Sequence, residues 1–332
     1  MYYFIVNPGS RSGNGKKVWK TVEELLDQEE TEYRVYFTSY RYHATKLAQE
    51  ITSRKERLTL VAVGGDGTVN EVLNGIRDFS LVTFAYIPTG SSNDFARALG
   101  LPSDTAAAVR NILHPSYFRR MDLGKVSLGE REQLFAVSCG CGYDAAICHA
   151  AFSSSVKNLL NRFRLGKLTY IATGVRQLIL CRPAPLSITL DNGRTLRYRR
   201  TFFAAAMNCR FEGGGVRFCP SALPDDGFLN LCIVEGPSRL LILPLFLLSL
   251  AGIHGIVSAT WQADTLAVFV KVIFLFGFRC PCAALVKGAH SQHDMTMGIA
   301  AVGVVNGKVH AHSSGNKLRG TVFPDKPDLF LS

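Results

Sequence analysis

The residues best suited to chemistry form the run Gly64–Thr68 (GGDGT), directly after the apolar segment Leu58–Val63. Two glycines at the end of a strand let the main chain approach a phosphate without a Cβ in the way. A helix that begins there presents N–H groups to the same anion. Asp66 would repel a phosphate unless Mg²⁺ lies between them or the carboxylate accepts a proton. The alternative is a plain turn in which Asp66 caps the helix.

Two further loops carry groups that suit an anion. In the segment Ile87–Gly100, the residues Gly90–Asn93 offer hydroxyls and main-chain donors. The segment Asn7–Lys17 (NPGSRSGNGKK) is basic and rich in glycine. It is not a Walker A motif, which requires Ser or Thr after the lysine, where Lys17 stands. On its own this loop is a weak signal, and a solvated turn is the alternative.

The elements that must hold these loops alternate as in an α/β domain. Strands are predicted at Tyr2–Val6, Tyr33–Thr38, Leu58–Val63 and Val82–Ile87, and helices at Lys16–Leu26, His43–Ser53, Val69–Gly75 and Asp94–Leu99. Each glycine-rich loop follows a strand and precedes a helix. Ligands bind at this edge of an open parallel sheet, so one site is expected at the carboxyl ends of these strands.

From about Tyr117 the pattern changes to strands separated by polar turns. These strands are predicted at Met121–Val126, Gln133–Ser138, Ala184–Leu190, Thr195–Asn208 and Phe228–Val234. Asp191–Gly193 indicates a hairpin turn, and Leu159–Leu180 a helical insertion. The sequence therefore predicts an α/β domain at residues 1–125 and a β-rich domain at residues 126–310.

The segment Leu240–Trp261 contains no charged residue if His254 is neutral. Its length would be enough to span a bilayer. However, Pro244 and two glycines interrupt it, and its most apolar part, Leu240–Ala251, is short. A buried or membrane-facing amphipathic helix is therefore favoured over a span.

Length and composition limit the class of protein. The 332 residues are 47% hydrophobic, which allows about two domains whose cores need no disulfide or metal. Nine cysteines without a CxxC pair favour reduced thiols in a cytosolic protein over a zinc ribbon. The N-terminus lacks the basic region of a signal peptide. The net charge of +11 suits a phosphorylated ligand, nucleic acid or an anionic membrane, but no aromatic-basic interleaving indicates a nucleic-acid binder.

Taken together, the motifs resemble the diacylglycerol/sphingosine lipid kinase family, in its bacterial branch. The resemblance rests on Asn7-Pro8, Gly64–Thr68 with Asn70-Glu71, Ser92–Phe95, Met121–Gly124 and the segment Cys219–Leu229. It covers about residues 2–254, in the family's order and spacing. The GGDGT turn alone is shared with NAD kinases, whereas the SNDFAR segment points to the lipid branch.

The resemblance implies a nucleotide domain similar to those of NAD kinases and phosphofructokinases, a β-sandwich-like second domain, and an active site between them. By motif matching, Asp66 is the expected catalytic residue. The ATP site would comprise Asn7, Thr38, Gly65, Asp66, Gly67, Thr68, Val69, Asn70, Glu71, Ser91 and Asn93. A structural Mg²⁺ would bind the Asp226 carboxylate and the carbonyls of Leu223 and Phe228, an oxygen set that suits a hard cation. A turn capped by acids is the alternative for that loop.

The sequence departs from the family near its C-terminus. The family carries an Asp-Gly-Glu there, from which an acidic residue reaches the transfer site. The nearest shape here is Val305–Lys308 (VNGK), and no glutamate follows Glu235. Residues 255–332 match the family poorly, and we interpret this tail as divergent or as encoded in a shifted reading frame. The resemblance therefore implies an impaired active site.

The leading hypothesis is an ATP- and Mg²⁺-dependent lipid kinase that transfers the γ-phosphoryl group to a hydroxyl of diacylglycerol or a related lipid, in phospholipid metabolism. Two alternatives stay open: a NAD kinase-like enzyme with a soluble substrate, and a nucleotide- or lipid-binding relative without catalysis. The expected location is the cytoplasm, peripheral at the inner membrane face. The expected partners are a lipid substrate and an anionic membrane, without nucleic acid, and a homodimer is left open.

Overall fold

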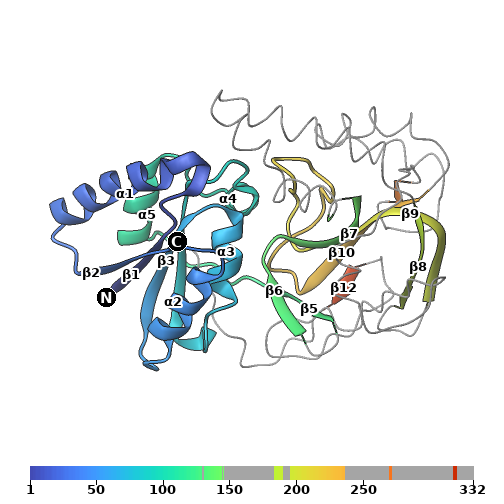
Figure 1. Cartoon of the computed structure of the whole chain (residues 1–332), viewed down its shortest axis with the longest axis horizontal. Coiled ribbons are helices and arrows are strands. Elements are labelled where there is room, and N and C mark those ends of the chain that lie inside the picture. The colour runs from blue at the N-terminus through green and yellow to red at the C-terminus, as the bar shows by residue number, and fades with distance from the viewer. Residues whose placement is uncertain are drawn as a thin grey trace.

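The computed structural model describes residues 1–128, 131–143, 145, 183–189, 195–235, 269–270 and 317–319 (Figure 1). The predicted helix Leu159–Leu180, the turn Asp191–Gly193, the apolar segment Leu240–Trp261 and the segment Val305–Lys308 lie outside these residues. Within the described part of the chain, no helix is both long enough and apolar enough to cross a bilayer.

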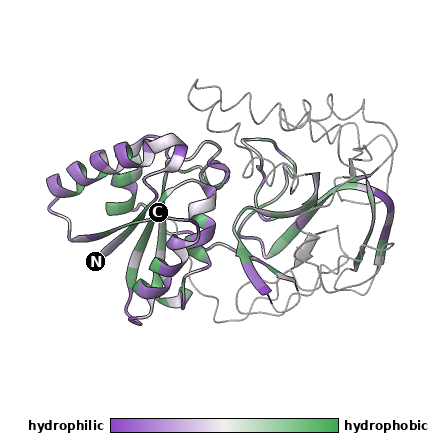
Figure 2. Cartoon of the chain, viewed as in Figure 1, coloured by the Kyte–Doolittle hydropathy of each residue, from purple (hydrophilic) through white to green (hydrophobic). Residues whose placement is uncertain are grey.

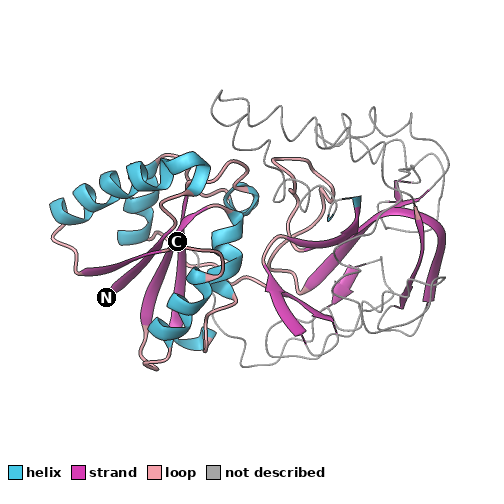
Figure 3. Ribbon diagram, in the orientation of Figure 1, coloured by secondary structure: helices cyan, strands magenta, loops and turns pink. Residues whose placement is uncertain are grey.

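The first domain is built on a four-stranded parallel sheet (Figure 3). Its strands are β1 (Tyr2–Val6), β2 (Tyr33–Phe37), β3 (Leu58–Gly64) and β4 (Val82–Pro88), in the order β2-β1-β3-β4. All four were predicted within one residue at either end. The reason is that β1, β3 and β4 are short apolar runs buried on both faces, which is typical of strands in a parallel sheet.

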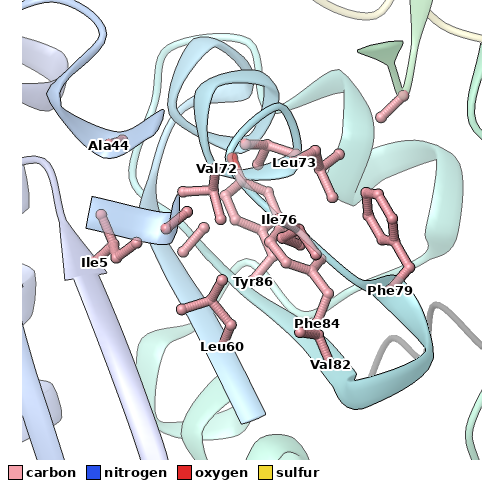
Figure 4. Packing of buried hydrophobic residues seen from close by; sticks show 14 of the residues in the cluster. Ile5, Ala44, Leu60, Val72, Leu73, Ile76, Phe79, Val82, Phe84 and Tyr86 are labelled. Carbon is pink, nitrogen blue, oxygen red and sulfur yellow. The ribbon is translucent and has the colours of Figure 1, made fainter. Parts of the chain in front are cut away.

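Helices cover both faces of this sheet. They are α1 (Ser10–Gln28), α2 (His43–Thr52), α3 (Asp66–Leu73), a 3₁₀ turn η1 (Phe79–Leu81), α4 (Asp94–Leu99) and α5 (Thr105–Leu113). Residues of α1 and α5 pack on one face, and residues of α2, α3 and α4 on the other. Figure 4 shows this second face, where Val72 and Leu73 of α3 pack near Phe84 and Tyr86 of β4.

The amphipathic pattern of α1 explains its orientation. Trp19, Val22 and Leu26 recur at helical spacing and are buried against the sheet, whereas Lys16 and Lys20 are exposed. The outer surface of α1 is accordingly hydrophilic in Figure 2. Burying such a face provides most of the stability of a helix in a protein.

Three helices of the first domain differ from the sequence prediction. Helix α3 begins at Asp66, three residues before the predicted start at Val69. Helix α1 begins at Ser10, inside the predicted loop, and its first turn contains the left-handed residues Arg11, Ser12 and Gly13, with φ of 45°, 58° and 92°. Helix α5 was not predicted, although the Asp104 carboxylate caps it by accepting the N–H of Ala107 at 2.9 Å.

The second domain is rich in antiparallel strands. Its strands are β5 (Gly124–Leu128), β6 (Arg131–Phe135), β7 (Ser138–Gly142), β8 (Ala184–Thr189), β9 (Thr195–Met207), β10 (Phe228–Glu235), β11 (Phe269–Val270) and β12 (Lys317–Arg319). The long strand β9 pairs with β7, β8 and β10 in antiparallel fashion, and β11 and β12 pair with β10. An α/β first domain followed by a β-rich domain confirms the predicted fold class.

The predicted strands at the start of the second domain were placed imprecisely. The single strand expected at Gln133–Ser138 is two strands, because Val137 leaves the ladder and its carbonyl accepts the N–H groups of Asn208 and Cys209. The strand expected from Met121 begins only at Gly124. The intervening Asp122 donates its N–H to the carbonyl of Pro224, at 2.6 Å.

Candidate active site between the two domains

The loops that follow the four parallel strands meet at one edge of the sheet, as predicted. The Asn7 side chain, after β1, donates a hydrogen bond to Thr68 Oγ1 at 3.1 Å. The N–H of Thr38, after β2, binds the carbonyl of Val6 at 2.9 Å, and the N–H of Thr89, after β4, binds the carbonyl of Gly64 at 2.6 Å. Residues predicted for the ATP site from separate motifs are thereby brought together.

The two glycine loops of this edge touch through their main chains. A Cβ added at Gly90 would lie 2.6 Å from the Cα of Gly65, and one added at Gly64 would overlap the Thr68 side chain. At Gly67, by contrast, an added Cβ would have no other atom within 4 Å. Gly64 and Gly90 are therefore required by close packing, whereas Gly67 leaves an open surface beside the start of α3.

Asp66 lies at the centre of this edge. Its carboxylate accepts the N–H of Asp94 at 3.1 Å and the N–H of Phe95 at 3.0 Å, which are the first N–H groups of α4. Asp66 itself is the first residue of α3. The carboxylate thus caps a different helix from the one that it begins, and its position relative to the glycine turn is fixed.

Asn93 is held by the backbone of its own loop and by a tyrosine beneath it. It adopts a left-handed φ of 50°, and its Oδ1 accepts the N–H of Gly90 at 2.9 Å. The Tyr86 hydroxyl lies 3.2 Å from both Asn93 Oδ1 and the carbonyl of Gly64. Burial raises the pKa of Tyr86, and the negative charges of Asp66 and Asp94 act in the same direction. The hydroxyl therefore stays protonated and can donate to these oxygens.

The other residues predicted to bind the nucleotide lie further along α3 from Asp66 or at the surface of the loop between β4 and α4. Val69 is 1% exposed in the hydrophobic core, and its N–H donates to the carbonyl of Gly65 at 3.1 Å. Asn70 accepts hydrogen bonds from the Asn74 side chain, and the carbonyl of Glu71 accepts one from Thr45 Oγ1 at 2.9 Å. Ser91 is exposed at the tip of the β4–α4 loop.

The basic loop after β1 is anchored at both ends and exposed between them. Ser10 and Thr89 share a hydrogen bond of 2.6 Å between their hydroxyls, in a buried position. Gly15 packs so closely on the carbonyl of Asn7 that a Cβ would overlap it. Arg11 and Lys16, between and beside these anchors, are exposed. Their charges therefore face solvent at the edge where an anion is expected.

The second domain reaches this edge through a glycine-rich turn. Asp94 is 4% exposed, and its Oδ2 accepts the N–H of Gly214 at 2.8 Å. Its Oδ1 forms an ion pair with Arg97. Burial raises the pKa of the Asp94 carboxyl, and Asp66 adds to this effect, while the N–H groups of Gly214 and Gly215 and the Arg97 charge oppose it. From its position alone, Asp94 was expected to be an ordinary acid at the start of a helix, and the family resemblance placed it with Ser92 and Asn93 at the far side of the site.

Two asparagines, neither predicted, also join the domains. Asn74, at the end of α3, donates to the carbonyl of Leu134 at 2.9 Å and accepts its N–H at 2.8 Å. Asn208 is fully buried and donates to the carbonyls of Asp122 and Ala136, both at 2.8 Å. No sequence signal identifies these residues, because their partners are main-chain groups distant in sequence.

The predicted metal loop is a tight turn that packs on the linker between the domains. Asp226 Oδ1 accepts the N–H of Phe228 at 3.0 Å, and Gly227 has a left-handed φ of 74° and donates its N–H to Asp122 Oδ2 at 2.6 Å. Arg119 forms an ion pair with Asp225 at 2.8 Å. Among the described residues, no group of three or more His, Cys, Asp or Glu side chains is arranged as a metal site.

The ligand set at this loop therefore stays a prediction. It draws on one carboxylate, that of Asp226, and on the carbonyls of Leu223 and Phe228. Such an oxygen set is chemically suited to Mg²⁺. The turn folds the Asp226 carboxylate back over the start of β10, which is compatible with this assignment.

Comparison with known proteins agrees with the geometry. The family profile for the diacylglycerol kinase catalytic domain matches residues 1–126, and that for the YegS C-terminal NAD kinase beta sandwich-like domain matches residues 138–260. YtlR of Bacillus subtilis is 30% identical over 240 residues, which cover 70% of this chain and 77% of YtlR. The chain belongs to the diacylglycerol kinase-type lipid kinase family.

Other members of this family extend the likeness. The diacylglycerol kinase of Bacillus subtilis is 29% identical over 251 residues, covering 75% of this chain and 78% of that protein. A solved structure of a diacylglycerol kinase from Bacillus anthracis (strain Sterne) has a TM-score of 0.53 and 25% identity, covering 73% of this chain and 75% of that one. The resemblance seen in the sequence is therefore confirmed. The names of these relatives support a kinase, which is a transferase, and the NAD kinase-like alternative is not favoured.

Proposed function

We propose that this chain is an ATP-dependent lipid kinase that transfers the γ-phosphoryl group to a hydroxyl of diacylglycerol or a related lipid. The observation that carries the proposal is the meeting of three phosphate-type loops around Asp66 at one sheet edge, in a member of a lipid kinase family. The second domain reaches the same edge through Gly214, so an acceptor held by that domain would lie near the phosphates.

The geometry supports phosphoryl transfer by positioning and charge neutralisation. The open main chain at Gly67, not the packed glycines 64 and 65, can admit a phosphate, and it lies at the start of α3, where the first N–H groups of a helix favour an anion. The acceptor hydroxyl oxygen forms a bond to the γ-phosphorus while the bond from that phosphorus to ADP breaks. The hydroxyl proton passes to a carboxylate, for which Asp66 is the candidate, or to water.

Metal ions enter this proposal at two places. Mg²⁺ bound with ATP would neutralise phosphate charge beside Asp66, and a structural Mg²⁺ would be held by Leu223, Asp226 and Phe228. Removing the metal with a chelator is expected to abolish transfer. Loss of thermal stability on the same treatment would favour the structural site, whereas unchanged stability would restrict Mg²⁺ to the nucleotide.

The decisive experiment is a transfer assay with radiolabelled ATP against a panel of lipids, with the products separated as lipid or nucleotide. Labelled phosphatidic acid or a related phospholipid supports the proposal. A labelled nucleotide would instead indicate a NAD kinase-like enzyme. ATP binding without any transfer would favour a non-catalytic relative, which the missing Asp-Gly-Glu motif makes worth testing.

The same assay bears on the divergent tail. If the C-terminal acid is absent and Asp66 replaces it incompletely, transfer should be slower by about 10²–10⁴-fold than in a relative that has the motif. Robust transfer by the unmodified 332-residue chain would make Asp66 a sufficient acid. An uninterrupted, reproducible reading frame for the tail would exclude the frameshift explanation.

Access to a lipid substrate requires contact with a membrane, and we propose a peripheral location at the cytoplasmic face. The net charge of +11 would draw the protein to anionic vesicles. Sedimentation with such vesicles should be strong at low salt and weak at high salt, since screening shortens the range to about 10 Å at 0.1 M. Salt-independent partitioning would indicate insertion of an apolar segment instead.

A further inference from the structure

The turn that carries Gly214 has an unusual backbone. Glu212 and Val216 exchange two main-chain hydrogen bonds, of 3.0 and 3.1 Å, and close a tight loop. Between them Gly213, Gly214 and Gly215 have φ of 68°, 92° and 104°. Residues with a Cβ adopt the angles of Gly214 and Gly215 only with strain, so the loop requires glycine at these two positions.

This loop is fixed to the first domain by a set of short contacts. The N–H of Gly214 donates to the buried Asp94 carboxylate, which also pairs with Arg97. The Arg97 guanidinium lies 5.8 Å from the centre of the Phe211 ring. It also packs over Gly215, where a Cβ would lie 3.2 Å from the guanidinium carbon. Because Asp94 is buried, water competes little for these hydrogen bonds.

The same residue connects the loop to the phosphate turn. The main-chain N–H of Asp94 donates to the Asp66 carboxylate, while the Asp94 side chain accepts the N–H of Gly214. A displacement of the glycine loop therefore acts on Asp66 through a single residue. The contact of Asn74 with Leu134, by contrast, lies at the far end of α3, away from Asp66.

We propose that Asp94, Gly214 and Gly215 form a latch that positions the second domain over the phosphate turn and orients Asp66 for transfer. Asp94 is then a positioning residue, not one that contacts the reacting atoms. The kinetic part of the test rests on the proposed function, since it needs lipid phosphorylation. A second measurement, of hydrogen exchange, does not depend on activity.

The kinetic test uses Gly215→Ala, with Gly213→Asn as the matched control on the same loop. The Gly215 change adds strain at φ 104° and a methyl group against Arg97, whereas Gly213 has open space around it and a φ of 68° that Asn tolerates. The ATP residues lie in the first domain, so the Kd for ATP should stay within about twofold. Turnover with lipid should fall about 10- to 100-fold, the scale expected for a misplacement of about 1 Å. Gly213→Asn should match wild type.

Equal loss of ATP affinity and turnover in Gly215→Ala, or turnover equal to wild type, would overturn the latch. The second readout is hydrogen exchange of the full chain, comparing wild type with Asp94→Ala. Exchange should rise in a peptide covering residues 211–217 and stay unchanged in one covering β6. Unchanged exchange at 211–217 would reject the latch. If wild type phosphorylates no lipid, the proposed function fails, and this measurement still decides the latch.

Discussion

Where the two domains meet, they contribute different kinds of group. The first domain supplies polar side chains, such as those of Asn74 and Asp94. These side chains form hydrogen bonds with main-chain groups of Leu134 and Gly214 in the second domain. Asp122 follows the same rule, since its carboxylate accepts the N–H of Gly227. Asn208, which donates its side chain to the Asp122 carbonyl, and the Arg119 ion pair with Asp225 are exceptions.

This difference determines which substitutions can disturb the contact between the domains. A side chain can be replaced by mutation, whereas a main-chain N–H is lost only through proline or a change in local backbone shape. In the first domain, the junction is therefore sensitive to replacement of individual side chains. In the second domain, it is sensitive to changes in backbone conformation. Substitutions on either side of the junction can test this division.

The largest effect is expected for Asp66→Asn. The change is isosteric and removes one charge, and loss of a proton acceptor or metal ligand should lower lipid transfer by at least about 10²-fold. The matched control is Asp104→Asn, because Asp104 also caps a helix through its carboxylate and Asn is an equally good cap. Similar activity of both variants in the labelled-ATP assay would reduce Asp66 to a structural cap.

Gly90→Ala tests the contact between the two glycine loops. The new methyl group would lie 2.6 Å from the Cα of Gly65, so the loops must separate, at a cost in unfolding free energy of up to about 3 kcal/mol. Gly67→Ala, in the same motif, meets no atom within 4 Å and should be neutral or slightly stabilising. Denaturant titration measures both, and equal destabilisation would contradict the packing argument.

Asn74→Ala should separate the domains at the far end of α3. It removes both hydrogen bonds with Leu134, each with a net contribution of about 0.5–1.5 kcal/mol. Asn111→Ala in α5 controls for the loss of an amide from a first-domain helix. A shift in the denaturation midpoint for Asn111→Ala as large as that for Asn74→Ala would refute the assignment of Asn74 to the junction.

The smallest effect concerns a site decided by local sequence alone. Gly100 ends α4 with a left-handed φ of 69°, and a Cβ there would meet no other atom. Gly100→Ala should therefore lose about 1 kcal/mol through backbone strain, without a clash. Gly100→Asn should lose less, because Asn tolerates this conformation. Thermal unfolding of the pair gives the comparison, and equal midpoints for Ala and wild type would contradict it.

The same division explains how far the sequence could be interpreted. The parallel strands and the loops after them were predicted because each loop is local: apolar run, glycines, then helix. Helix α5 was within reach, since Asp104 precedes an alanine-rich run with high helix propensity. The break at Val137 was not, because it depends on Asn208, far along the chain.

Within the candidate site, the limit lies at the domain junction. Sequence motifs brought out Asn7, Asp66 and Asn93, whose residue types suggest chemistry. They could not assign Asp94 its partner, because that partner is the N–H of Gly214, 120 residues later. Three consecutive glycines were the one available signal, and they specify a backbone shape, not a contact.

The core of the first domain also depends on residues that are synthesised later. One of its two hydrophobic clusters includes Ala136 and Cys209, which belong to the second domain. Burial raises the pKa of the Cys209 thiol to about 12, so it is a neutral, apolar part of that cluster. As the chain leaves the ribosome, Cys209 follows α4 on the order of ten seconds later. Until then this cluster lacks the residues that the second domain contributes, so the core of the first domain is completed only after most of the second domain has been made.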